Sequence, residues 1–197
     1  QVLSRRYNLP IYANHATWLA MEPMLGPIAK ENKRYIEPGT LLEFGDLDVL
    51  SYQVSHDAAD PQFYAFQKGK RQFVMLTDTG YLPDRLRGQL KNADAYLIES
   101  NHEIEMLRYG AYPWSLKQRI LSDKGHLSNE DGALAIRDLM GPKSKHIYLG
   151  HLSRDNNTKQ LALDTVTRVL NQYDIDAQSD LTLHMTDPSQ ATLLHDL

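Results

Sequence analysis

Residues 71–80 read RQFVMLTDTG, an apolar strand pattern that runs into a turn and carries Asp78 directly after the predicted strand. The same arrangement, a predicted strand followed closely by a metal-capable side chain, recurs at His56 (strand 48–54) and His151 (strand 146–149). Side chains at the ends of strands in an α/β sheet share one rim, where the sheet is rigid and the loops stay open to substrate. We therefore expect these three residues to form one site.

The wider pattern predicts one α/β domain over residues 1–197. Short strands dominate the first half, and the turn at 68–70 predicts a hairpin. From Pro83 onward helical and strand-like segments alternate, which is typical of helices covering a sheet. Further strands are expected at residues 9–12, 40–44, 63–67, 95–98 and 181–183, and helices at 15–21, 83–90, 104–109, 114–121, 130–140 and 159–170.

The composition is that of an ordinary globular protein, with 42% hydrophobic and 23% charged residues in a chain of 197. The absence of cysteine excludes disulfides and thiolate metal sites, so a metal would be bound by His, Asp or Glu. This suits the cytoplasm, where we expect the protein. A net charge of -4 argues against a surface that is basic all over, although a local cationic patch for a polyanion is compatible with it.

Two observations concern the ends of the chain and membranes. No apolar run approaches the ~18 residues of a membrane span, and no basic leader precedes an apolar segment, so we expect neither a membrane span nor a signal peptide. The chain starts at Gln1, and residues 2–7 have the pattern of a helix already under way. We expect an N-terminally incomplete domain.

Neutral imidazole and carboxylate groups suit zinc, manganese or iron, and the two oxygens of Asp78 can bridge a pair of ions. Such a pair lowers the pKa of a shared water and supplies hydroxide near neutral pH. Each residue also has a plain structural alternative. His56 can cap a turn with its neighbour Asp57, Asp78 is a good turn former, and His151 can belong to a loop that leads into a helix.

Several motifs together resemble the metallo-β-lactamase superfamily, in particular its nuclease and phosphodiesterase branch. The resemblance spans nearly all of the chain. The motifs are residues 55–58 (SHDA), 76–80 (LTDTG), 97–103 (LIESNHE), 112–117 (YPWSLK), 125–130 (GHLSNE) and 149–157 (LGHLSRDNN).

The resemblance implies a four-layer αββα sandwich with two divalent ions, Zn or Mn, at the rim between its sheets. It implies that His56 binds the first ion, His151 the second, and Asp78 both. His126 is the implied catalytic helper, which stabilises charge or delivers a proton at the leaving oxygen; a turn histidine before a helix cap is the alternative. The candidate substrate-binding residues are His102, Trp114 and Ser153; His102 could instead orient a ligand or lie in a surface loop.

The sequence departs from the family pattern in one respect. The first ligand motif of the superfamily, His-x-His-x-Asp-His, does not occur among these 197 residues. Since three ligands shared between two ions leave each ion with two protein contacts, we expect only partial metal occupancy of the chain as given.

The resemblance implies metal-assisted hydrolysis of phosphodiester bonds, with nucleic acid as the substrate and DNA favoured. Cationic side chains at residues 68, 70, 71, 85, 87, 108, 117 and 119 are possible polyanion contacts, and Trp114 and Tyr112 can stack on bases. Two alternatives stay open: a small-molecule ester or lactone hydrolase on the same fold, and a non-catalytic interaction protein. The oligomeric state is not indicated.

Overall fold

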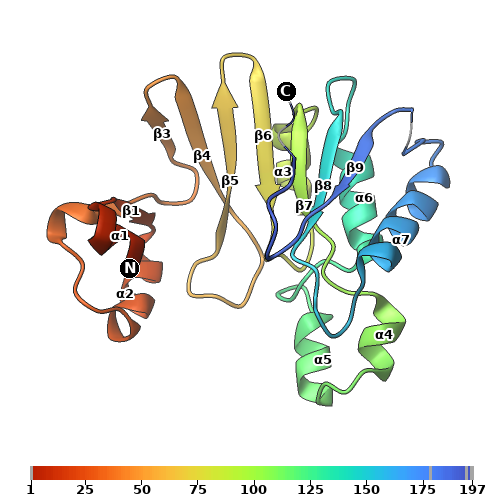
Figure 1. Ribbon diagram of the computed structural model, residues 1–197, viewed down its shortest axis with the longest axis horizontal. Coiled ribbons are helices and arrows are strands. Elements are labelled where there is room, and N and C mark those ends of the chain that lie inside the picture. The colour runs from red at the N-terminus through yellow and green to blue at the C-terminus, as the bar shows by residue number, and fades with distance from the viewer. Residues whose placement is uncertain (1, 178, 194, 196–197) are drawn as a thin grey trace.

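A seven-stranded sheet dominates the computed structural model, which describes residues 2–177, 179–193 and 195 (Figure 1). Its order is β3-β4-β5-β6-β7-β8-β9; neighbours from β3 to β6 pair antiparallel, and neighbours from β6 to β9 pair parallel. The strands are β3 (Leu41–Phe44), β4 (Leu47–Gln53), β5 (Gln62–Lys68), β6 (Arg71–Leu76), β7 (Ala95–Glu99), β8 (His146–Gly150) and β9 (Thr182–Met185). The predicted α/β class is confirmed.

A small N-terminal unit lies beside β3 at the edge of this sheet (Figure 1). The side chain of Asn14 accepts a hydrogen bond from the Thr17 backbone N–H at 2.8 Å and so caps the second helix, which begins at His15 as expected. Two short strands of the unit pair in parallel. Its elements are α1 (Val2–Tyr7), β1 (Ile11–Ala13), α2 (His15–Met21), the 3-10 turns η1 (Glu22–Met24) and η2 (Lys30–Asn32), and β2 (Lys33–Tyr35).

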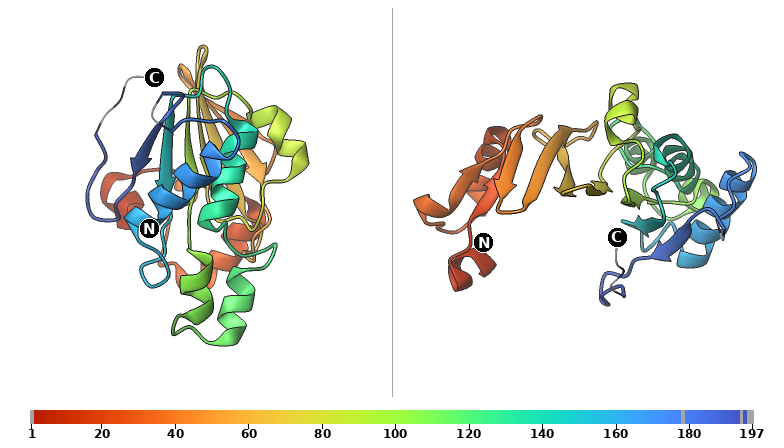
Figure 2. Two further views of the ribbon diagram at one scale, coloured as in Figure 1. Left: turned by 90° about the vertical axis from the view of Figure 1, so that its right-hand side faces the viewer. Right: turned by 90° about the horizontal axis from the view of Figure 1, so that it is seen from above.

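Helices cover one face of the parallel half of the sheet (Figures 1 and 2). They are α3 (Asp84–Leu90), α6 (Asn129–Leu139) and α7 (Lys159–Asn171). Apolar residues of β7 and β8 pack against them in the main core, where Ile98, Leu149 and Leu170 have no exposed surface. Sheet and helices form two successive layers of the expected αββα order. None of the described helices is long and apolar enough to cross a membrane.

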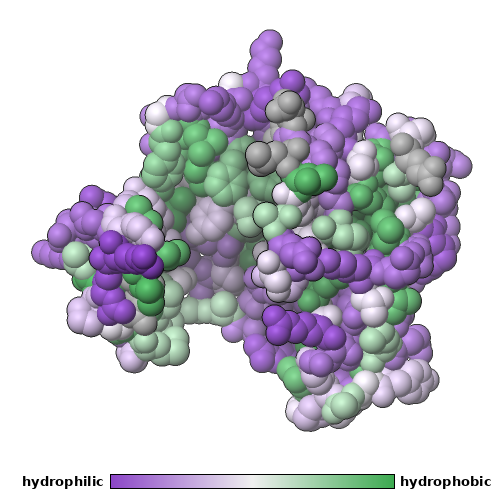
Figure 3. All heavy atoms as spheres, in the orientation of Figure 1, coloured by the Kyte–Doolittle hydropathy of each residue, from purple (hydrophilic) through white to green (hydrophobic). Residues whose placement is uncertain are grey.

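The opposite face of the sheet carries aromatic side chains. The ring of Phe73 lies 6.2 Å from that of Phe66 and 6.4 Å from that of Tyr148, measured between centroids. The C-terminal segment, residues 186–193 with 195, crosses this face in front of the parallel strands (Figure 1). Figure 3, in the same orientation, shows hydrophobic residues gathered on this side of the sheet.

Strand direction decides where the functional side chains meet. The chain reverses twice between β4 and β6, so these two strands run in the same direction, and β7 and β8 continue it. The carboxyl ends of β4, β6, β7 and β8 therefore lie at one edge of the sheet. Two short helices, α4 (Ile104–Tyr109) and α5 (Trp114–Ile120), lie beyond this edge (Figure 1).

The buried face of α7 should carry much of the stability of this fold. Leu170→Ala removes a fully buried side chain and leaves a cavity, which we expect to lower the free energy of unfolding by about 2–5 kcal/mol. Leu19→Ala on α2 is the matched control, because that leucine is 58% exposed and its loss should change stability by less than about 0.5 kcal/mol. Urea unfolding followed by circular dichroism measures both, and equal effects would contradict the assigned core.

Candidate metal centre

The strands at the rim end in turns that the surrounding chain holds in place. Asp78 and His151 have φ values of 55° and 58°, in the left-handed region that residues with side chains adopt only at a cost. Gly80 has no room for a side chain, since a Cβ there would lie 2.2 Å from the Asp123 backbone. These constraints fix the path of the backbone on both sides of the site.

Three imidazole rings surround the carboxylate of Asp78. Its Oδ1 lies 3.8 Å from Nε2 of His56, 3.7 Å from Nε2 of His151 and 3.9 Å from Nδ1 of His126. The ring of His126 lies between the other two, with centroids 4.9 Å from His56 and 5.2 Å from His151. The structure thus brings together the three predicted ligands and the predicted helper.

A buried carboxylate, Glu99 at the end of β7, holds two of these rings. With no exposed surface, its Oε1 accepts hydrogen bonds from Nδ1 of His126 and Nδ1 of His151, both 2.7 Å long, while Oε2 accepts one from the Thr79 backbone N–H at 3.1 Å. Burial acts to raise the pKa of Glu99, but the hydrogen bonds from the two histidines outweigh it and lower the pKa below its usual value. The hydrogen bond to Glu99 also raises the pKa of His151.

These hydrogen bonds also determine which ring nitrogens are free to bind an ion. Nδ1 of His56 lies 3.0 Å from the Gly125 carbonyl oxygen, which can only accept, so this nitrogen carries the proton and Nε2 keeps its lone pair. The bond to Glu99 has the same effect on His151. Both free nitrogens are the ones that lie near Asp78.

The spacing fits divalent ions. Bonds of about 2.0–2.2 Å from an ion to nitrogen or oxygen put two ligand atoms of one ion about 3–4 Å apart. The distances from Asp78 to His56 and His151, 3.8 and 3.7 Å, lie in that range. One donor atom each from Asp78, Glu99, His126 and His151 also lies within 4.8 Å of the others. The donor set can hold metal ions around the Asp78 carboxylate.

A cavity of about 400 Å³ opens over the three histidines. Its wall includes Tyr112 from the segment before α5, Arg119 from α5 and Ser153 from the loop after β8. Nε and Nη2 of Arg119 both donate to the Asp57 carboxylate, which lowers the pKa of Asp57 and holds the guanidinium at the cavity. The hydroxyl of Tyr112 donates to Asp155 at 2.7 Å.

The three predicted substrate-binding residues occupy different environments. Ser153 lines the cavity, whereas Trp114 is 64% exposed on α5 and is not part of the wall. His102 is only 1% exposed, and neither ring nitrogen has a hydrogen-bond partner. Burial lowers the pKa of His102 to about 4, so its ring is neutral at pH 7. Substrate contacts by His102 and Trp114 stay predictions, and the burial of His102 argues against the alternative of an exposed surface loop.

Glu99 is the residue of this site that the sequence prediction did not single out, although a signal was present. The strand predicted at residues 95–98 is followed directly by this glutamate, and the other three predicted strands are followed by His56, Asp78 and His151 after one intervening residue. Applied to all four strands, the same rule about strand ends selects Glu99.

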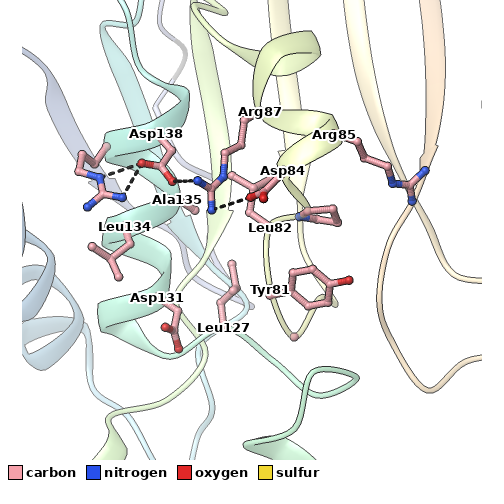
Figure 4. A pocket seen from close by; sticks show the side chains of 13 residues that line it. Tyr81, Leu82, Asp84, Arg85, Arg87, Leu127, Asp131, Leu134, Ala135 and Asp138 are labelled. Carbon is pink, nitrogen blue, oxygen red and sulfur yellow. Dashed lines mark hydrogen bonds and ion pairs between the residues drawn. The ribbon is translucent and has the colours of Figure 1, made fainter.

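A larger cavity, of about 680 Å³, lies between α3 and α6 (Figure 4). Arg87 bridges Asp84 and Asp138 across it, at 3.2 and 3.1 Å, and Arg137 also pairs with Asp138. The charges of these arginines are offset by acidic partners. This cavity has no cluster of imidazoles, so we place the chemistry at the smaller one.

Comparisons with known proteins show which family the chain resembles. A family profile described as the beta-lactamase superfamily domain matches residues 1–151. The exodeoxyribonuclease YycJ of Bacillus anthracis is 50% identical over 191 residues, which cover 97% of this chain and 72% of that protein. The exodeoxyribonuclease WalJ of Streptococcus pneumoniae is 51% identical over 198 residues, which cover 100% of this chain and 74% of that protein.

A solved structure shares the fold at low sequence identity. The metallo-β-lactamase fold protein YhfI from Bacillus subtilis superimposes with a TM-score of 0.62 at 16% identity, over 90% of this chain and 62% of that one. The likeness concerns the arrangement of strands and helices.

The role of Glu99 can be tested through metal affinity. Glu99→Gln replaces a carboxylate that accepts from two histidines by an amide that can also present a donor, so the orientation of His151 should be lost. We expect zinc affinity to fall by about 10–100-fold, measured by competition with a chromogenic chelator. Glu105→Gln on α4 is the matched control, since that exposed glutamate lies outside the rim and pairs with Arg108 in the same helix. An unchanged affinity of Glu99→Gln would contradict the orienting role.

Proposed function

The chain belongs to the metallo-β-lactamase superfamily and, within it, to the group of YycJ and WalJ, and from this we propose that it is a metal-dependent exodeoxyribonuclease. The observation that carries the proposal is the convergence of the free nitrogens of His56 and His151 on the carboxylate of Asp78. Relatives at about half identity, both named exodeoxyribonucleases, support DNA as the substrate.

In this proposal His56 binds the first ion, His151 binds the second, and Asp78 contributes to both. The ions are zinc or manganese, because imidazole and carboxylate ligands suit either. When bound, divalent ions withdraw charge from a phosphodiester and ease the deprotonation of the attacking water. The hydrogen bonds from His56 to Gly125 and from His151 to Glu99 keep both rings in the tautomer that such ions require.

In this proposal His126 is a proton donor and not a metal ligand. Its Nδ1 donates to Glu99, which leaves Nε2 as the ring atom that can give a proton to the leaving oxygen of DNA. The hydrogen bond to this buried carboxylate sets the orientation of the ring. The pair His126 and Glu99 is therefore the proposed general acid with its orienting residue.

The cavity wall supplies candidate contacts for the phosphate backbone. Arg154 and Ser153 line the cavity, and among the ion pairs of the described residues none involves Arg154. Its guanidinium is thus available to a phosphate, whereas Arg119 is already paired with Asp57. We propose that Arg154 and Ser153 bind the strand and that Tyr112 provides an aromatic surface for a base.

The two other functions considered have less support. A hydrolase of small esters or lactones can use the same fold. The relatives that are about 50% identical to this chain, however, are named exodeoxyribonucleases. A purely non-catalytic role would not explain why His56 and His151 both present an unprotonated nitrogen toward Asp78. The lack of cysteine suits the cytoplasm, which is the proposed location.

Asp78→Ala tests the enzyme assignment. Loss of the shared carboxylate should remove several kcal/mol of transition-state stabilisation and lower kcat/KM on end-labelled DNA by about a thousandfold or more, with Mn²⁺ or Zn²⁺ supplied. Asp46→Ala, which changes an exposed aspartate paired with Lys68, should keep full activity. DNA hydrolysis at the unmodified rate by Asp78→Ala would contradict the metal site, and faster turnover of lactones than of DNA would contradict the substrate.

His126→Ala separates a proton donor from a metal ligand. As a general acid, His126 should contribute about 10²–10⁴-fold to kcat, while metal content measured by mass spectrometry stays unchanged. His15→Ala, an exposed histidine outside the rim, should change neither quantity. A loss of bound metal in His126→Ala would show that this ring is a ligand instead.

A further inference from the structure

A second group of histidines lies at the other end of β8 from His151. His146 is the first residue of β8, and His184 lies in β9. The pairing of His146 with Thr182 and of Tyr148 with His184 makes the two histidines diagonal neighbours on one face of the sheet. Ile147 points to the buried core instead, so His146, Tyr148 and His184 lie on the face away from the helices.

The C-terminal segment brings a third imidazole to this group. The ring centroid of His195 lies 4.4 Å from that of His184 and 5.3 Å from that of His146. Nδ1 of His146 lies 3.0 Å from Nε2 of His184. One ring nitrogen from each of the three residues lies within 4.8 Å of the others.

These distances suit a single tetrahedral ion. Zinc binds imidazole nitrogen at about 2.0–2.1 Å, so two nitrogens on one tetrahedral ion lie about 3.3 Å apart. The pair formed by His146 and His184 is close to this spacing, and one ring nitrogen of His195 lies within 4.8 Å of a nitrogen of each of the other two rings. A water molecule would complete the coordination.

The aromatic surroundings of the group restrict the orientation of its rings. Tyr148 stacks on His184 with centroids 4.6 Å apart and an angle of 20° between the rings, which limits rotation of His184. No ion pair of the described residues involves His146, His184 or His195, so no carboxylate salt bridge competes for them.

We propose that His146, His184 and His195 form a second metal site, which binds one transition-metal ion and fastens the C-terminal segment to β8 and β9. Three nitrogen ligands without a carboxylate select zinc, copper or nickel over magnesium, calcium or manganese. His146 begins β8 and His151 directly follows its last residue, so the two sites are separated by roughly 16 Å at ~3.3 Å per residue. The site is therefore independent of the catalytic rim and of the function proposed for it.

Calorimetric titration with zinc tests the site after the catalytic rim has been disabled. In the background His56→Ala, Asp78→Ala, His151→Ala, we expect one zinc ion to bind per chain. Adding His195→Ala should weaken this binding at least tenfold, because one of three ligands is lost, whereas adding His15→Ala should leave it unchanged. Cobalt in place of zinc should give the intense visible absorption of a tetrahedral site, and this absorption should disappear with His195→Ala.

The unmodified rim provides a second arm that does not depend on the folding of the triple variant. His195→Ala alone changes a surface residue of the C-terminal segment and should lower the zinc content by one ion per chain without altering DNA hydrolysis. Zinc binding that is equally tight with and without His195, or no zinc bound at micromolar concentration in the triple variant, would overturn the proposal.

Discussion

The carboxylate of Glu99 has no exposed surface, and the hydrogen bonds that satisfy it hold the whole rim together. A buried charge is costly unless it is paired, and here the Nδ1 protons of His126 and His151 and the backbone N–H of Thr79 supply the partners. Each partner belongs to a different loop. A single interior charge therefore fixes two imidazole orientations and the turn that carries Asp78.

Sheet topology makes this convergence possible. Two reversals between β4 and β6, followed by parallel β7 and β8, bring four carboxyl ends to one edge. The core between β7, β8 and the helices α6 and α7 keeps these ends from moving, since its side chains are fully buried. Positive φ at Asp78 and His151 is tolerated because the surrounding contacts hold the turns. The rigid sheet thus holds the side chains of the site in fixed positions.

The two ends of β8 show how one strand can support two separate groups of histidines. At its carboxyl end, the imidazoles lie together with the carboxylates of Asp78 and Glu99, so the potential metal ligands include both nitrogen and oxygen atoms. At its amino end, the neighbours are aromatic rings and other histidines. This difference in ligand chemistry is why we assign a hydrolytic role to the first group and a structural one to the second.

The sequence by itself determined the α/β class, the strand ends that carry His56, Asp78 and His151, and the family, because periodicity and motifs are local in the chain. Tertiary structure alone decided the partners of Glu99, which lie 27 and 52 residues away, and the burial of His102. It also separated Ser153, at the cavity, from Trp114, outside it. The reason is physical: hydrogen-bond partners and burial depend on strand order and helix packing, which join residues that are distant in the sequence.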